Sequence, residues 1–313
     1  MRRVYLLVCC LVLAACATTP PPPTLTPTPE PYQVALVMKT LTNPFFVEME
    51  RGARQAEAEF GIALTVRTAA QETSIEQQVE IIEELTAQGI DAIVIAPGDS
   101  VELIPVLQRA QAAGIIVVNI DNRLNPEVAA SQGLVDVPFI SVDNEAGAYK
   151  AAEYLSQQVD GPTEAVIIEG IREAQNAQDR RDGAVRAFEA SDNITIVASE
   201  TANWMIDEAV TVAEQVFTEH PEAKVVFAAN DMMALGVVEY LERAGREDVI
   251  VGGFDALPQA TSALGTTPLV VTVDQQAAQQ GYTGVDYAVR LLNGQTVPPE
   301  TMVDTLLMTA EAE

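Results

Sequence analysis

The stretch QVALVMKTLTNPFFVEMERGARQAEAEFG (33–61) contains the pattern that decides the fold. Its start, 33–38, is an apolar run without polar alternation, which is typical of a strand covered on both faces. From Pro44 to Phe60 apolar residues recur at helical spacing, as at Phe45, Met49 and Ala53, and Gly61 ends the segment. The stretch therefore predicts one complete strand–helix unit.

The same alternation continues along the chain. Further strands are predicted at 62–66, 91–96, 115–120, 164–169, 194–199, 224–229, 248–253 and 269–273. Helices are predicted at about 74–89, 100–113, 145–159, 178–190, 206–219 and 231–244, with a last one ending near Leu292. Ser74 and Gln77 have the spacing of a helix-capping pair. The pattern predicts an α/β fold of two doubly wound parallel-sheet lobes, between which the chain crosses more than once.

The N-terminus has the pattern of an export signal. A basic start, Met1 to Arg3, precedes an apolar run that is too short to span a bilayer. Leu13-Ala14-Ala15-Cys16 resembles the lipobox of bacterial lipoproteins, which predicts a signal peptide at 1–15 and lipid attachment at Cys16. An ordinary signal peptide with an incidental cysteine is the alternative.

A proline- and threonine-rich tract, TTPPPPTLTPTPEP (18–31), follows the predicted anchor. Such a composition favours an extended chain with nothing to bury. We expect residues 16–31 to form the lipid anchor and a tether that holds the folded part off a membrane. A proline-rich recognition motif is the competing interpretation.

Charge and residue usage exclude several functions. The chain has 45 acidic against 17 basic residues, so its surface repels phosphate backbones and nucleic-acid binding is not expected. All three cysteines lie at or before Cys16, and the one histidine, His220, is predicted to lie in a loop. The sequence contains no GxSxG, GxxxxGK[ST], GxGxxG, HExxH or paired CxxC motif. We therefore expect no metal, no cofactor and no enzymatic activity.

Polar and aromatic residues follow the carboxyl ends of the predicted strands, where open α/β sheets bind ligands. They are Lys39, Asn43, Phe45, Phe46, Asp121, Asn122, Arg123, Arg180, Trp204, Asn230, Phe254, Asp255 and Gln275. Amide, carboxylate and guanidinium groups pair with adjacent hydroxyls, and aromatic rings stack on the apolar faces of sugars. The set predicts a neutral, polyhydroxylated ligand.

Six motifs resemble, in order and spacing, those of the ribose-type periplasmic sugar-binding proteins of ABC importers, also called type I solute-binding proteins. They are KTLTNPFF (39–46), APGDS (96–100), VVNIDN (117–122), the R-x-x-G of Arg180 to Gly183, VFAANDMMALG (226–236) and VGGFDA (251–256). The resemblance implies an N-terminal lobe of 33–142 plus 276–304 and a C-terminal lobe of 143–275 plus 305–313. It also implies hinge strands near Val142-Asp143, Asp255 and Gln275.

The resemblance implies sugar hydroxyl partners at Asn43, Asp121, Arg180, Asn230, Asp255 and Gln275, and stacking rings at Phe45, Phe46, Trp204 and Phe254. Ribose binders of this family usually have a small hydroxyl residue where Lys39 stands, an arginine directly after the aspartate, and phenylalanine at the position of Trp204. The ligand is therefore expected to be a monosaccharide that need not be ribose: a hexose, a pentose or a sugar alcohol. Lys39 is expected either to contact it or to lie at the periphery.

The resemblance implies a monomeric protein that closes on its sugar and delivers it to a membrane permease. The lipobox-like segment predicts that this protein is exported and lipid-anchored on the outer face of the cytoplasmic membrane, in the periplasm or at the cell surface. A sensor subunit that reports sugar occupancy to a membrane receptor or kinase would use the same closure of two lobes around the sugar. A lactose-repressor-type regulator has a similar core but begins with a basic helix-turn-helix, whereas here a signal and tether stand in that place. A sugar-active enzyme is the weakest alternative.

Overall fold

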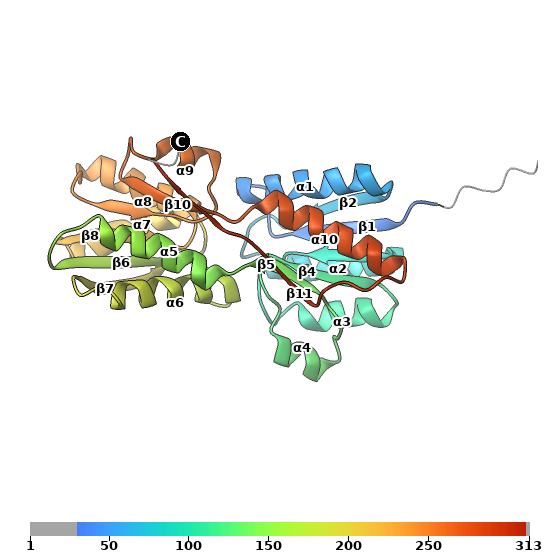
Figure 1. Ribbon diagram of the computed structural model, residues 1–313. Helices are drawn as coiled ribbons and strands as arrows, with labels where there is room; N and C mark the ends of the chain where they lie inside the picture. Colours follow the sequence, from blue (N-terminus) through green and yellow to red (C-terminus); the bar gives the residue numbers. More distant parts are fainter. Residues whose placement is uncertain (1–29, 311–313) are drawn as a thin grey trace, which may run out of the picture. The chain divides into compact units, whose positions relative to one another are not determined.

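The first sheet consists of six parallel strands in the order β11-β5-β4-β3-β1-β2 (Figure 1). A computed structural model describes residues 30–310, and the part from Pro31 onward forms one compact unit. Val34 and Leu36 of β1 join one hydrophobic core, whereas Ala35 and Val37 join another. This alternation requires helices on both faces of the sheet. The strands are β1 (Gln33–Met38), β2 (Ala63–Thr68), β3 (Ala92–Ile95), β4 (Ile116–Ile120), β5 (Phe139–Val142) and β11 (Glu300–Val303).

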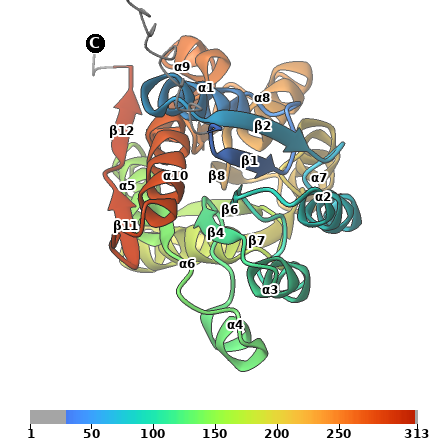
Figure 2. The ribbon, with the colours of Figure 1, turned by 90° about the vertical axis from the view of Figure 1, so that its right-hand side faces the viewer.

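Helices α1 and α10 cover one face of this sheet, and α2 and α3 cover the other (Figure 2). The contact between α1 and α10 is close because both helices present glycine there. A Cβ on Gly52 would lie 1.8 Å from the Ala278 carbonyl oxygen, and one on Gly281 would lie 2.1 Å from that of Met49. We call the first sheet and its helices the first lobe. These helices are α1 (Pro44–Phe60), α2 (Ile75–Gln88), α3 (Ile104–Ala112), α4 (Pro126–Gln132) and α10 (Ala277–Leu292).

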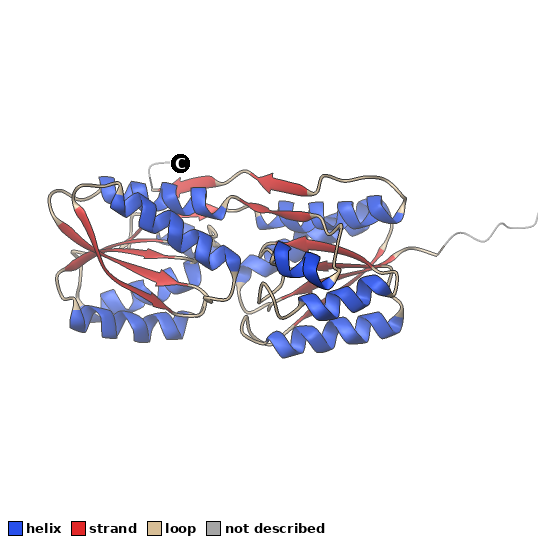
Figure 3. Cartoon of the chain, turned by 90° about the horizontal axis from the view of Figure 1, so that it is seen from below, coloured by secondary structure: helices blue, strands red, loops and turns tan. Residues whose placement is uncertain are grey.

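The second sheet has the order β12-β10-β9-β8-β6-β7, and only β12 runs antiparallel to its neighbour. Figure 3 shows helices on both sides of each sheet. We call this sheet and its helices the second lobe. Its strands are β6 (Thr163–Glu169), β7 (Ile194–Thr201), β8 (Ala223–Ala228), β9 (Ile250–Gly252), β10 (Leu269–Asp274) and β12 (Leu306–Thr309). Its helices are α5 (Asn144–Gln157), α6 (Gln175–Glu189), α7 (Ile206–Glu219), α8 (Asp231–Ala244) and α9 (Pro258–Ala263).

The chain passes between the two sheets at three places in the described part: between β5 and α5, between β10 and α10, and between β11 and β12. The expectation of a hinge strand at Asp255 is wrong. Asp255 lies between β9 and α9, and the strands on either side of it, β9 and β10, pair with each other in the second sheet. The chain therefore stays in the second lobe at Asp255.

The predicted fold class is confirmed, and every strand predicted in the described range is present. Five short elements, namely β5, α4, α9, β11 and β12, were not assigned from the sequence because each has too few residues to display a period. The predicted capping pair is wrong. Ser74 precedes α2 but makes no side-chain cap, and the Gln77 side chain instead accepts a hydrogen bond from the Ala70 amide at 2.8 Å.

The predicted signal peptide (1–15), Cys16 and nearly all of the tether (16–31) lie outside the described residues. Within residues 30–310, none of the helices has the length and apolar character needed to span a bilayer.

Candidate ligand-binding site

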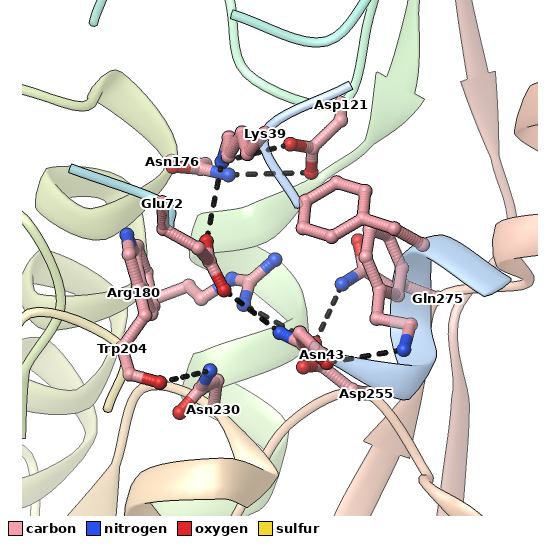
Figure 4. Close-up of a pocket in the computed structure, with 12 residues that line it drawn as sticks. Lys39, Asn43, Glu72, Asp121, Asn176, Arg180, Trp204, Asn230, Asp255 and Gln275 are labelled. Atoms are coloured by element: carbon pink, nitrogen blue, oxygen red, sulfur yellow. Dashed lines mark hydrogen bonds and ion pairs between the residues drawn. The ribbon is translucent and has the colours of Figure 1, made fainter. Parts of the chain in front are cut away.

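A cavity of about 230 Å³ lies where the carboxyl ends of strands from both sheets meet (Figure 4). Each lining residue follows a strand of one of the two sheets, so both lobes contribute. The lining residues are Lys39, Asn43, Phe45, Phe46, Glu72, Asp121, Asn176, Arg180, Trp204, Asn230, Asp255 and Gln275.

Backbone strain is concentrated around this cavity. Three of the lining residues have left-handed or otherwise positive φ angles: Asp121 at 62°, Trp204 at 68° and Asp255 at 124°. Such conformations are costly for residues other than glycine and persist only where the surroundings impose them. Their clustering at one cavity indicates that the chain is held there for a function.

Two helices begin at the cavity, and the residue that caps each one lines it. The Asn43 side-chain oxygen accepts a hydrogen bond from the Phe45 amide at the start of α1, at 3.0 Å. Asn230 caps α8 in the same way through the Met233 amide, at 2.9 Å. Capping fixes each carboxamide oxygen, so its NH₂ group remains as a positioned donor. The positive ends of both helix dipoles also favour the acidic residues around the cavity.

The first lobe contributes one lysine shared between two acids. Lys39 is 2% exposed, and its Nζ lies 3.0 Å from Asp121 Oδ2 and 3.9 Å from Glu72 Oε2. Asn43 donates to Glu72 Oε1 at 2.9 Å. The lysine is therefore a cavity residue and not a peripheral surface residue.

The second lobe contributes an arginine that is fixed on several sides. Arg180 donates to Asn144 Oδ1 at 2.8 Å, to the Ala229 carbonyl at 2.9 Å and to Asp255 Oδ1 at 3.4 Å. Its guanidinium lies 3.9 Å from the centroid of the Phe254 ring. Gln275 donates to the same Asp255 oxygen at 2.6 Å. This network holds the planar donor and the carboxylate in one orientation.

Aromatic rings supply the apolar part of the lining. Phe45 and Phe46 meet edge to face with centroids 5.0 Å apart, and Trp204 lies in the lining as well. The indole requires glycine at position 170, because a Cβ there would lie 2.1 Å from Trp204 Cζ2. Rings next to fixed polar groups match the two kinds of surface that a sugar presents.

Some buried polar atoms of the lining have no hydrogen-bond partner among the described residues. They are Trp204 Nε1, Asn176 Oδ1 and Asp121 Oδ2, the last of which faces Lys39 as an ion pair without hydrogen-bond geometry. Buried polar groups in native proteins are almost always paired. One donor and one acceptor without a partner, beside an ion-paired carboxylate oxygen, fit a hydroxyl ligand, because a hydroxyl both donates and accepts.

Burial shifts the ionisation of the charged groups in the cavity. It raises the pKa of the Glu72 carboxyl, against the opposing charge of Lys39. It raises the pKa of Asp255 well above its ordinary value, against Arg180, and it lowers the pKa of Arg180. A guanidinium stays protonated at any physiological pH, so this site keeps its cation. Each shift reflects charge taken out of water, which ligand hydroxyls can partly replace.

The charge balance of the lining selects the class of ligand. Two cations, Lys39 and Arg180, stand against three acids, Glu72, Asp121 and Asp255, and all five side chains are buried. Each cation already faces an acid, Lys39 with Asp121 and Arg180 with Asp255, so neither is left to bind a phosphate or carboxylate group, and the lining accepts neutral ligands. No group of histidine, cysteine or acidic residues suited to a metal ion is found within residues 30–310. The site is therefore suited to binding a neutral polyol.

Ten of the thirteen predicted site residues line the cavity, and three do not. Asn122 is fully buried and donates to the Pro97 carbonyl at 3.1 Å. Arg123 forms an ion pair with Glu300 at 2.6 Å and covers the Phe139 ring. Phe254 lies beneath Arg180 and outside the lining. The left-handed backbone at Asp121 explains why Asn122 and Arg123 lie outside the lining, because it directs consecutive side chains apart.

Two lining residues, Glu72 and Asn176, were missed. Glu72 follows the carboxyl end of β2, so the rule that identified the other residues would have included it. Asn176 precedes Arg180 by one helical turn on α6, which places both on the same face. The helical spacing between Asn176 and the predicted site residue Arg180 was the signal that could have identified Asn176.

Comparison with known proteins identifies the family. Residues 34–296 match the model of the periplasmic binding protein domain. The chain is 40% identical over 285 residues to the D-ribose/D-allose-binding protein of Pseudomonas aeruginosa, covering 90% of this chain and 88% of the relative. It is 32% identical over 285 residues to the D-allose-binding periplasmic protein of Escherichia coli, covering 88% of this chain and 92% of that protein.

A solved structure agrees with these relatives. An ABC transporter periplasmic solute binding protein from Actinobacillus succinogenes with bound D-allose superimposes with a TM-score of 0.84 and 36% identity, covering 90% of this chain and 98% of that one. The chain belongs to the periplasmic binding protein family. It is an extracytoplasmic binding protein and not an enzyme.

Proposed function

We propose that the chain is the substrate-binding component of an ABC sugar importer and that the cavity holds one monosaccharide. The lining carries this proposal, because it combines fixed polar groups, aromatic rings and buried polar atoms without a hydrogen-bond partner among the described residues. With this many charge-assisted hydrogen bonds out of water, we expect micromolar affinity or better, about −8 kcal/mol or more favourable.

We propose D-allose as the first sugar to test and D-ribose as the second. The names of the relatives in Pseudomonas and Escherichia, and the sugar in the Actinobacillus structure, support this choice. The residues that we propose as its contacts are those that line the cavity, including Glu72 and Asn176. Asn122, Arg123 and Phe254 are proposed to act outside the contact set.

We propose that the sugar is enclosed by movement of the lobes, 33–142 plus 276–304 against 143–275 plus 305–313. Cavity residues on both lobes support this, because a ligand in contact with both must enter while they are apart. The closed, liganded form would then deliver its sugar to the permease. The lipobox-like Leu13 to Cys16 supports anchoring on the outer face of the cytoplasmic membrane through Cys16.

The binding proposal is tested by calorimetry with D-allose and D-ribose on the purified chain and on two arginine variants. Arg180→Ala removes a cavity arginine, and the expected loss is about 1.5–3 kcal/mol because Asp255 loses its charged partner. Arg123→Ala is the matched control, since this arginine lies outside the lining. Equal affinities of both variants, each confirmed to be folded by thermal unfolding, would overturn the site. Failure of the wild-type chain to bind any pentose, hexose or polyol would overturn the function.

A further inference from the structure

Helix α6 of the second lobe begins without a cap of its own. The residue at its N-cap position is Ala174, which has no side-chain acceptor. The first amides of a helix have no partner within the helix and require one elsewhere. Two of them, those of Gln175 and Asn176, are satisfied by side chains of the other lobe.

The acceptors come from loops that follow β3 and β4 in the first lobe. The Gln175 amide donates to Ser100 Oγ at 3.0 Å, and the Asn176 amide donates to Asn122 Oδ1 at 3.2 Å. Ser100 is 5% exposed and Asn122 is fully buried, so water does not compete for these bonds in this conformation. Two residues of one lobe thus cap a helix of the other.

Both acceptors are also held by contacts within the first lobe, which do not involve α6. The Asn122 amide group donates to the Pro97 carbonyl at 3.1 Å and to Ser100 Oγ at 3.3 Å. The Ser100 carbonyl accepts from the Asn125 amide at 2.7 Å. Preorganised acceptors lose little freedom when the helix docks, so more of each bond's energy favours the docked state.

We propose that Ser100, Asn122 and the amides of Gln175 and Asn176 form an interlobe latch that exists only when the lobes are closed. Asn122 is then a positioning residue that favours closure and makes no contact with the sugar. This inference rests on the proposed function, because it concerns the closure that encloses the sugar.

The latch also positions a cavity residue. The backbone of Asn176 is held by Asn122, while its side chain donates to Asp121 Oδ1 at 3.4 Å and lines the cavity. The same residue therefore links closure to the site. Weakening the Ser100 bond should reduce the affinity for every sugar that requires closure by the same factor, because neither Ser100 nor Gln175 belongs to the lining.

A double-mutant cycle tests the Ser100 bond. Gln175→Pro removes the donor at a helix position that tolerates proline, and Ala174 already has the extended backbone, φ −89° and ψ 127°, that proline requires before it. Gln175→Ala is the matched control: it keeps the amide and removes only the side-chain bond to Asp179. We expect Ser100→Ala to weaken D-allose binding between about 2-fold and about 12-fold in the Gln175→Ala background and not at all in the Gln175→Pro background.

A second measurement does not depend on sugar affinity. With D-allose at saturation, hydrogen exchange of the Gln175 and Asn176 amides should be faster in Ser100→Ala and Asn122→Ala, respectively, than in the wild-type chain. Ser100→Ala should also weaken D-allose and D-ribose by the same factor. Additive effects in the cycle, unchanged amide exchange, or a changed ratio between the two sugars would overturn the latch. Absence of sugar binding by the wild-type chain would instead overturn the proposed function, whereas sugar binding with unchanged amide exchange would overturn the latch alone.

Discussion

The two lobes each place a buried cation at the cavity, but they hold it in different ways. In the first lobe Lys39, a flexible side chain with three donors, is shared between Asp121 and Glu72. In the second lobe Arg180 is fixed by two neutral oxygen acceptors, one carboxylate and the face of Phe254. One half of the site is a compensated charge cluster and the other is a rigid clamp.

The difference suggests a division of work between affinity and selectivity. A clamp whose geometry is set before the ligand arrives strengthens binding to any sugar that places hydroxyls at its fixed positions. A lysine with rotatable donors and two acids that share it responds to which hydroxyls are present. We therefore expect the second lobe to determine how tightly sugars bind, and the first lobe to determine which sugar binds best.

The rigidity of the second lobe has a stability cost, which gives the largest predicted effect. Asp231 is fully buried behind the clamp, where it accepts hydrogen bonds from Thr272 at 2.7 Å and from the Leu257 amide at 2.8 Å. Burial raises its pKa from 3.8 to about 7, against those two hydrogen bonds. The folded state therefore keeps a proton that the unfolded state has lost, so stability should fall as the pH rises from about 4 to about 7 and then level off.

Asp231→Asn should remove this fall, which amounts to up to about 4 kcal/mol for a shift of about three units. The measurement is urea unfolding at several pH values, with the difference between wild type and variant taken at each. Asp248→Asn is the control, because the hydrogen bond from Arg246 lowers the pKa of that exposed carboxyl, and its difference profile should have the opposite sign. Parallel profiles for wild type and Asp231→Asn would contradict the prediction.

Lys39→Met tests the selectivity assigned to the first lobe. The substitution keeps an unbranched side chain but removes the charge between Asp121 and Glu72, and the raised pKa of Glu72 should rise further. We expect D-allose binding to weaken by about 1.5–3 kcal/mol, as for the loss of a charged hydrogen bond, and the ratio of D-allose to D-ribose affinity to change.

Calorimetry with both sugars on Lys39→Met and Arg180→Ala makes the comparison between lobes direct. Arg180→Ala should weaken the binding of the two sugars by similar factors, whereas Lys39→Met should weaken them by different factors. An equal ratio of D-allose to D-ribose affinity in the two variants would show that affinity and selectivity are not determined by different lobes.

The sequence predicts the site well wherever the chemistry is local to one strand end. Lys39, Arg180 and Gln275 were all identified because ligands bind beyond the carboxyl ends of parallel strands. It fails at Asn122 and Arg123, because the positive φ of Asp121 turns the chain and no local motif encodes that turn. The role of Ser100 and Asn122 at α6 was also out of reach, since the helix that they cap is remote in sequence and belongs to the other lobe.

Trp204→Phe gives the smallest expected effect. It tests how much the aromatic ring that the second lobe places in the lining contributes to sugar affinity. The smaller ring removes Nε1, which has no partner among the described residues, and leaves a gap against Gly170. The backbone strain at φ 68° is the same for both residues, and we expect sugar affinity to fall by about 1 kcal/mol. Calorimetry measures the variant, and the wild-type indole, the one tryptophan in the sequence, reports binding by fluorescence.

Gly170→Ala separates ring contact from a general loss of packing. A Cβ at this position would lie 2.1 Å from Trp204 Cζ2, so alanine should displace the indole and weaken sugar binding in the wild-type background. In the Trp204→Phe background the same methyl group occupies the vacated gap and should be tolerated. The two substitutions should therefore be strongly non-additive, because they act on one contact. Additive losses would mean that Trp204 does not act through its fit between Gly170 and the sugar. The contribution of the second lobe to affinity would then be assigned to Arg180 and Asp255.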